Sequence, residues 1–281
     1  MRESVSAPLA SRRDGVEVVS ESTHGWILYL DKISVSFDGF QALDGLSLVI
    51  NVGELRCIIG PNGAGKTTLM RMIMHSTPLD GGTIEFVQTG EHGNSVVVLS
   101  DLPTHRMAGL GVVKSNQVIM DFNKLTIWDS LLLASSEAKF EQPHRIFSEG
   151  SVYRRHEGEI RAWLDFFPFA DPTGFAQSAG EKKLLDIVRC LLLKPRFLLL
   201  DEPAAGLPNE LTAKVMEAIK FLSDEGTTVV IVEHDLSLIW NICERVHFMA
   251  EGQVLLQGEP DEIRKHSTVI EKYLGKGHVA G

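Results

Sequence analysis

The possible folds of this chain are narrowed most by a glycine-rich segment that directly follows an apolar run. The segment matches the phosphate-binding pattern G-x-x-x-x-G-K-[ST] and consists of Gly60, Pro61, Asn62, Gly63, Ala64, Gly65, Lys66, Thr67 and Thr68. The apolar run at residues 55–59 predicts a strand, and residues 68–74 predict a helix. Glycines let successive backbone N–H groups turn toward a phosphate chain, and the helix start directs its positive end at the same anion. A chance turn would not bring the strand and the helix with it.

Two side chains of this segment have the chemistry that a nucleoside triphosphate requires. Lys66 can reach the β- and γ-phosphates, and the Thr67 hydroxyl can bind Mg²⁺. The segment alone indicates a triphosphate site and does not say which reaction takes place there.

Two acids mark the end of a second buried strand. Residues 197–200 are wholly apolar, which is typical of a strand covered on both faces of a parallel sheet, and Asp201 and Glu202 follow at once. Asp201 fits the role of holding the Mg²⁺ shell, mostly through waters, while Glu202 can face the γ-phosphate and polarise an attacking water. The alternative is a pair of ordinary surface acids, but these acids lie where an open α/β sheet places its ligand.

Composition excludes several classes of protein. The 281 residues carry a formal net charge of −10, which argues against a dedicated nucleic-acid binder. Cys57, Cys190 and Cys243 lie in apolar segments, so we expect core thiols in a reducing compartment. No apolar run approaches the length of a membrane span, so we expect a soluble chain that meets a membrane only through a partner.

Apolar periodicity predicts two α/β segments separated by a helical block at about residues 121–178. The expected strands are residues 26–37, 46–50, 55–59, 83–87, 197–200, 227–232, 245–249 and 254–257. A further strand is expected to begin at residue 112, and residues 96–99 are expected to be a hairpin partner or an insertion. The expected helices are residues 68–74, 126–138, 157–167, 179–193 and 209–224, with a short helix starting near 102 and a loop over 142–151.

A pentapeptide before the helix at 179–193 identifies a family. Gln177, Ser178, Ala179, Gly180 and Glu181 stand where the ATP-binding subunits of ABC transporters carry their LSGGQ signature, and this chain resembles that family over about residues 27–275. The resemblance implies that Ser178, Ala179 and Gly180 contact the γ-phosphate of a nucleotide held by a second subunit.

Other positions match further parts of the family pattern. The resemblance implies that Phe37 stacks on adenine, with Phe40 a lesser candidate, and that Gln117 contacts Mg²⁺ and water and senses the membrane partner. It implies that His234 is the γ-phosphate-sensing switch and that residues 204–207 form the D-loop. The simpler alternatives are turn packing for Phe37, a polar loop residue for Gln117 and a helix cap for His234.

The resemblance also implies a fold and a domain organisation. It predicts an α/β P-loop NTPase with a RecA-like core, an N-terminal antiparallel β region and an inserted α-helical subdomain. The expected parts are a flexible extension at residues 1–26, one ATPase domain at 27–275 and a tail at 276–281. Within the domain the core comprises 27–120 and 179–275, and the helical subdomain comprises about 121–178.

As for function, the resemblance implies an ATP-hydrolysing subunit that uses ATP and Mg²⁺ at the cytoplasmic face of the membrane. Its expected partners are transmembrane permease subunits, a second ATPase subunit, identical or paralogous, and indirectly a solute-binding protein. Residues 37–43, 102–106, 201–207 and 269–275 look like the ATPases of branched-chain amino-acid importers, and residues 55–59 and 178–182 look closer to the urea or short-chain amide branch.

Three departures from the pattern bear on coupling to the membrane subunit more than on chemistry. Gln177 replaces the usual signature Leu, Asn116 replaces an aromatic beside Gln117, and Glu181 replaces the signature Gln. The alternatives are a soluble ABC ATPase, a non-catalytic regulatory subunit, and a GTPase or kinase, for which residues 123–126 lack the guanine-reading Asp.

Overall fold

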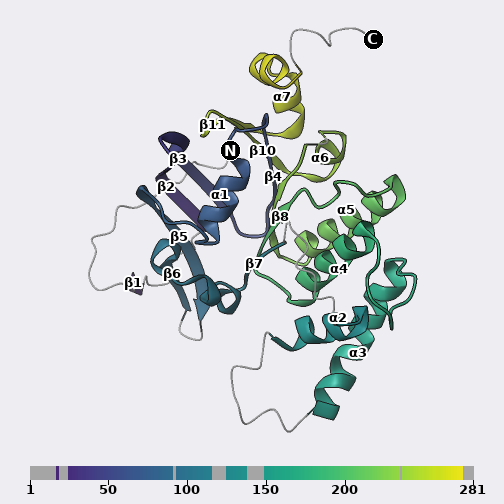
Figure 1. Ribbon diagram of the computed structural model, residues 1–281. Helices are drawn as coiled ribbons and strands as arrows, with labels where there is room; N and C mark the ends of the chain where they lie inside the picture. The colour runs from purple at the N-terminus through teal and green to yellow at the C-terminus, as the bar shows by residue number, and fades with distance from the viewer. Residues whose placement is uncertain are drawn as a thin grey trace.

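The computed structural model describes residues 17–18, 25–90, 93–115, 125–137, 149–234 and 236–274. In this part of the chain, two β-sheets and the helices around them form successive layers (Figure 1). An antiparallel sheet lies on one side, a mostly parallel sheet lies in the middle, and helices cover the far side.

The antiparallel sheet has five strands in the order β1-β6-β5-β2-β3. Their bounds are β1 Glu17–Val18, β6 Gly93–Val98, β5 Gly81–Gly90, β2 Trp26–Phe37 and β3 Phe40–Asn51. Apolar and polar residues alternate in β2 and β3, so one face of this sheet is buried. Strands β2 and β3 meet at a tight turn and pair from Phe37 with Phe40 to Trp26 with Asn51.

The central sheet has six strands in the order β11-β10-β4-β9-β8-β7. Their bounds are β11 Gln253–Gly258, β10 Arg245–Ala250, β4 Leu55–Ile59, β9 Thr228–Val232, β8 Phe197–Asp201 and β7 Val112–Lys114. All neighbours are parallel except the β10–β11 hairpin at the edge. Every residue of β4, β8 and β9 is buried.

Strand β8 shows why these apolar runs form central strands. Phe197 and Leu199 belong to the core between the two sheets, whereas Leu198 and Leu200 belong to the core under the far helices. Alternate side chains of a strand point to opposite faces, so a wholly apolar run is stabilised only where both faces are covered.

The helices occupy two layers. Helix α1, Lys66–Ile73, lies between the sheets and buries Leu69, Met70, Met72 and Ile73. The far face of the central sheet is covered by α4 Ala179–Leu192, α5 Asn209–Asp224, α6 Leu236–Ile242 and α7 Pro260–Lys265. Helices α2 Ile127–Glu137 and α3 Glu149–Phe166 pack on α4, and α8 Ser267–Val269 follows α7. Short 3₁₀ helices span Leu99–Asp101, Thr104–Arg106 and Ala108–Leu110, and a π-helix spans Ile270–Leu274.

Several elements differ from the expectation. Helix α3 begins at Glu149, so the predicted loop over 142–151 is wrong at its last three residues, because the polar first turns carry no apolar periodicity. Strands β3 and β5 are longer than predicted, since hairpin pairing continues past their apolar centres. Strand β1 lies inside the segment predicted as a flexible extension, and it pairs with β6. Helix α6 was not predicted.

Two other expectations concern the cysteines and membrane-spanning helices. The cysteines are buried with free thiols, as predicted. Across the described residues each helix is too short or too polar to span a bilayer.

Candidate functional site

The glycine-rich loop is held where only glycine fits. Gly60 and Gly65 have φ angles of 155° and 96°. A Cβ on Gly60 would collide with the Met249 carbonyl oxygen, and a Cβ on Gly65 would lie 2.6 Å from the Ala42 carbonyl oxygen. The loop is therefore clamped between β10 and β3 at the carboxyl end of β4, and its shape is fixed before a ligand arrives.

Lys66 begins α1 and is bound by the loop itself. Its Nζ donates to the carbonyl oxygens of Gly60, at 2.7 Å, and Pro61, at 3.0 Å, and the residue is 6% exposed. Burial lowers the pKa of the Lys66 ammonium, and the charges of Glu202 and Asp201 act against that shift. The loop thus holds a desolvated cation among acceptors that an anion can replace.

Asp201 closes β8 and is buried. It is 3% exposed, and neither carboxylate oxygen has a hydrogen-bond partner among the described residues. Burial raises the pKa of this carboxyl, while the nearby cations Lys114 and Lys66 oppose the rise. The Ser115 hydroxyl fixes the strand end by accepting from the Asp201 backbone N–H at 3.1 Å. A buried carboxylate without a hydrogen-bond donor stays ionised only beside a positive charge.

A divalent cation fits that requirement. The described residues contain no group of three His, Cys, Asp or Glu side chains that would hold a metal alone. Mg²⁺ is bound in nucleotide sites by one or two protein oxygens together with phosphates and waters. Asp201 and the Thr67 hydroxyl, which lines the adjoining cavity, supply such a set.

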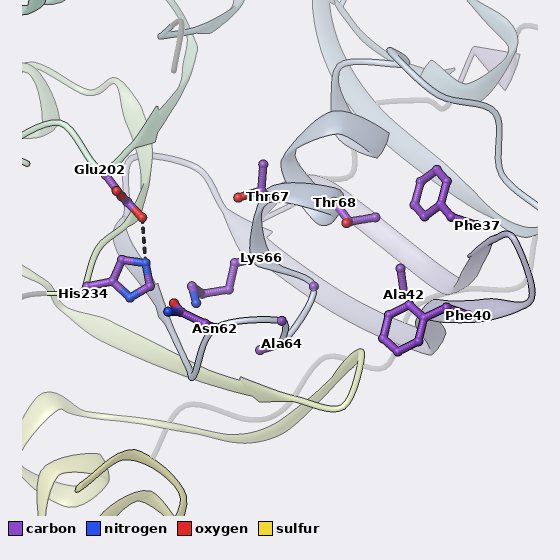
Figure 2. Close-up of a pocket in the computed structure, with 12 residues that line it drawn as sticks. Phe37, Phe40, Ala42, Asn62, Ala64, Lys66, Thr67, Thr68, Glu202 and His234 are labelled. Carbon is purple, nitrogen blue, oxygen red and sulfur yellow. Dashed lines mark ion pairs between the residues drawn. The ribbon is translucent and has the colours of Figure 1, made fainter. Parts of the chain in front are cut away.

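Glu202 and His234 meet across two strand ends. Glu202 has a φ of 50°, so the chain turns sharply after β8 and this side chain does not follow Asp201 into the core. Its Oε1 lies 2.6 Å from Nε2 of His234, which follows β9 (Figure 2). Because β8 and β9 are parallel neighbours, both residues lie at the same sheet edge. The two side chains form an acid–imidazole pair that faces the loop.

One cavity of about 350 Å³ joins these parts. It is lined by Phe37, Phe40, Ala42, Asn62, Gly63, Ala64, Gly65, Lys66, Thr67, Thr68, Glu202 and His234. Figure 2 shows Lys66, Glu202 and His234 at one end and Phe37 and Phe40 at the other. The two aromatic residues are 39% and 65% exposed, so their rings are available to a planar ligand. The cavity is charged at one end and aromatic at the other.

The predicted signature residues lie elsewhere. Ser178 caps α4 by accepting from the Glu181 N–H at 3.0 Å, and Ala179 and Gly180 form the first turn. These residues do not line the cavity of their own chain. Gln117 and Asn116 lie outside the described residues.

Two polar residues near the site were not assigned a role from the sequence. Glu233 is 3% exposed and accepts from the N–H groups of Ala204 and His234, and Lys183 of α4 donates to the Ala205 carbonyl oxygen at 2.9 Å. Burial raises the pKa of Glu233 against those two backbone hydrogen bonds. The position of Glu233 at the end of a buried apolar strand, like that of Asp201, was the available signal.

Comparison with known proteins agrees with this geometry. A family model described as "ABC transporter" matches residues 43–205. The branched-chain amino acid transport ATP-binding protein LivG of Salmonella typhimurium is 31% identical, over 89% of this chain and 98% of its own. The lipopolysaccharide export ATP-binding protein LptB of Escherichia coli is 29% identical, over 87% of this chain and 95% of its own.

A solved structure gives the same fold. The ADP conformation of MJ1267, an ATP-binding cassette of an ABC transporter, superposes with a TM-score of 0.70 at 26% identity, over 89% of this chain and 99% of that one. The predicted P-loop α/β fold is confirmed. The chain therefore belongs to the ABC transporter family and is one of its ATP-hydrolysing, nucleotide-binding cassettes.

Proposed function

We propose that this cassette powers an ABC importer and that Glu202 polarises the water that attacks the γ-phosphate of ATP. The observation that carries this proposal is the pair of Glu202 and His234, 2.6 Å apart, facing the loop that holds Lys66 in one cavity. A carboxylate can act as a general base when a neighbouring group orients it toward the water.

Each end of the cavity has a part in binding. Lys66 exchanges the carbonyl oxygens of Gly60 and Pro61 for the β- and γ-phosphates, and the N–H groups of residues 62–68 surround those phosphates. Phe37, with Phe40 beside it, stacks on the adenine at the aromatic end. Binding energy from the base and the phosphates then fixes the γ-phosphate next to Glu202 and His234.

The proposed cation site consists of Thr67, Asp201 and, by the family resemblance, Gln117. Bound Mg²⁺ would neutralise charge on the phosphates. Asp201 remains ionised in that arrangement because the cation supplies the partner that its buried oxygens lack. Thr67 sits directly after Lys66, so one helix turn would supply both a ligand for the cation and the ammonium for the phosphates.

The cavity is half of the proposed catalytic site. Ser178, Ala179 and Gly180 lie at the start of a helix, where N–H groups and a hydroxyl suit a phosphate, yet they do not line their own cavity. We infer that they contact the γ-phosphate bound to a second cassette, either a copy of this chain or a paralogue. ATP then favours the closed pair because that state adds phosphate contacts, and hydrolysis removes the preference.

The proposed cargo is a branched-chain or other hydrophobic amino acid, or else urea or a short-chain amide. The name of LivG supports the first, and residues 55–59 and 178–182 favour the second by resemblance.

The proposed partners are transmembrane permease subunits at the cytoplasmic face of the membrane and, through them, a solute-binding protein. The alternative is an ABC ATPase that is not coupled to transport. The relative LptB is named for an export system, so a cassette that powers export is the comparison for the proposed importer.

Purification of the tagged chain from its own cells, with reconstitution of whatever membrane subunits accompany it, tests this function. We expect ATP hydrolysis to rise with one class of solute, among branched-chain amino acids, urea and short-chain amides, when the solute-binding protein is added. The same complex carrying Glu202→Gln controls for contaminating ATPases. A chain that purifies without membrane subunits and hydrolyses ATP at a rate that no solute changes would support the uncoupled alternative.

A further inference from the structure

Glu233 joins the two loops that carry the acid–imidazole pair. It follows β9 and is 3% exposed. Its Oε1 accepts from the Ala204 N–H at 3.0 Å, and its Oε2 accepts from the His234 N–H at 3.1 Å. One carboxylate therefore holds the backbone of both loops.

These contacts close a ring around the site. Ala204 is two residues beyond Glu202, and the His234 side chain returns to Glu202 at 2.6 Å. The ring runs from Glu202 along the chain to Ala204, across to Glu233, on to His234 and back to Glu202. Movement of one loop relative to the other would change the distance between Glu202 and His234. The two hydrogen bonds of Glu233 restrain that movement.

Packing holds the first of these loops only in part, because Ala204 is 6% exposed and belongs to the core whereas Ala205 and Gly206 are exposed. A second cavity of about 440 Å³ is bordered by Ala204, Ala205, Gly206 and Glu233. Small side chains next to open space make few dispersion contacts. Hydrogen bonds hold the loop as well. The Glu202 N–H donates to the Val232 carbonyl oxygen at 2.8 Å, the Ala204 N–H donates to Glu233, and Lys183 of α4 donates to the Ala205 carbonyl oxygen at 2.9 Å.

We propose that Glu233 is a positioning residue that holds His234 against Glu202 by tying the backbone of His234 to that of Ala204. The inference rests on the proposed roles of Glu202 and His234 in hydrolysis. Glu233 does not touch the nucleotide cavity, so its effect belongs to the chemical step and not to binding.

Substitution Glu233→Gln keeps the size of the side chain and removes one acceptor. The amide group then faces a backbone N–H donor, so one of the two loops must move. We expect kcat for ATP to fall about 10-fold to 100-fold, as for a reacting group displaced by about 1 Å. We expect KM for ATP and the Kd of a fluorescent ADP analogue to stay within about twofold, with kcat expressed per nucleotide-binding chain.

Glu54→Gln is the matched control. The Glu54 side chain is 20% exposed and also accepts a backbone N–H, that of Asn51 at 3.0 Å, and it pairs with Arg56 as well. It lies before β4, at the end of the strand opposite the loop. This variant should lose stability and keep kcat. An equal loss of kcat in both variants would mean that general destabilisation explains the effect, and the proposal would be overturned.

A double-mutant cycle with His234→Ala separates this inference from the function on which it rests. If Glu233 acts through His234, Glu233→Gln costs at most about twofold in single-turnover hydrolysis once His234 is already alanine. The same fold-loss in both backgrounds overturns the inference while leaving the role of His234 intact. A His234→Ala chain that hydrolyses ATP at the parent rate instead refutes the role of His234, and with it this inference.

Discussion

At the scale of single residues, the two acids that end β8 differ in their surroundings although they are adjacent. Asp201 is buried with unpaired oxygens, while Glu202 turns out of the strand with a positive φ and meets His234. The first environment suits a cation and the second suits a base that exchanges protons with water. One change of backbone direction thus separates the two proposed roles.

A buried histidine far from the cavity gives a prediction about acid stability. His247 in β10 is fully buried, and its Nε2 lies 2.9 Å from Nη1 of Arg56. Burial first, and then the cations Arg56 and Arg245, lower the pKa of His247 from 6.5 to about 3. The unfolded chain takes up this proton below 6.5 and the folded chain does not, so stability is lost as the pH falls.

The expected loss is about 1.4 kcal/mol in the free energy of unfolding between about pH 7.5 and about pH 5.5. Urea denaturation at each pH measures it. His247→Gln, which keeps an acceptor for Arg56 and has no proton to gain, isolates this residue from other titrating groups. A difference between parent and variant that does not change with pH would show that His247 binds its proton equally well in the folded and unfolded states, and would contradict the lowered pKa.

Residue chemistry was predictable where it lies within a local motif. Lys66, Thr67 and Glu202, which the sequence singled out, line one cavity because a loop pattern and a strand end determine their positions. The hydrogen bonds of Lys66 to its own loop, and those of Glu233 and Lys183 to residues 204–205, were not predictable. The bonds of Lys66 depend on the backbone path of its loop, and those of Glu233 and Lys183 depend on how β8, β9 and α4 pack. Spacing along the chain encodes neither.

At the scale of elements, the start of α4 is held by an unusual number of hydrogen bonds. The Glu181 carboxylate accepts from the N–H groups of Ala170, Gln177 and Ser178, at 3.1, 3.0 and 3.3 Å, and forms a capping box with Ser178. The family signature carries Gln at this position, and an amide offers only one acceptor oxygen. The acid therefore rigidifies the proposed γ-phosphate contact in this chain.

Glu181→Gln should lower the free energy of unfolding by about 1 kcal/mol, since at least one backbone N–H loses its acceptor. Chemical denaturation measures this change. Glu217→Gln, on the exposed face of α5, serves as the control and should have no effect beyond about 0.5 kcal/mol. Equal stability of the two variants would contradict the structural role of Glu181.

The elements that the sequence predicted best are those with clear signals at both ends. Strand β4 and helix α5 have the predicted bounds, because apolar runs and clear stop signals delimit them. The start of α3 and the short helix α6 were missed because polar or brief segments carry weak periodicity. Strand β1 pairs with residues about 80 positions away, and such pairing is set by tertiary structure.

At the scale of the whole molecule, the layers place the loop, the acids and His234 at one edge of the central sheet. The order β10-β4-β9-β8 follows from packing and could not be read from the chain, although the alternation of strands and helices predicted a parallel sheet. The start of α4 lies apart from the cavity in the same chain. On the proposed mechanism, the molecule thus contains both parts of a site without joining them.

Association of two chains follows from that arrangement. Light scattering of the Glu202→Gln chain with ATP and Mg²⁺ should give about twice the mass of the 31.0 kDa chain, because unhydrolysed ATP holds the closed pair. Lys66→Ala in the same background is the control and should stay monomeric. A particle of unchanged mass that has bound ATP would count against a pair of identical cassettes.

The role of Glu202 is tested most sharply by measuring the rate of ATP hydrolysis of the Glu202→Gln chain together with its affinity for nucleotide. We expect hydrolysis to fall at least about 100-fold, the usual contribution of a general base, with the Kd of a fluorescent ATP analogue within about twofold of the parent value. Glu217→Gln should match the parent in both. Hydrolysis by the Glu202→Gln chain at the parent rate would contradict the assignment of Glu202 as the base.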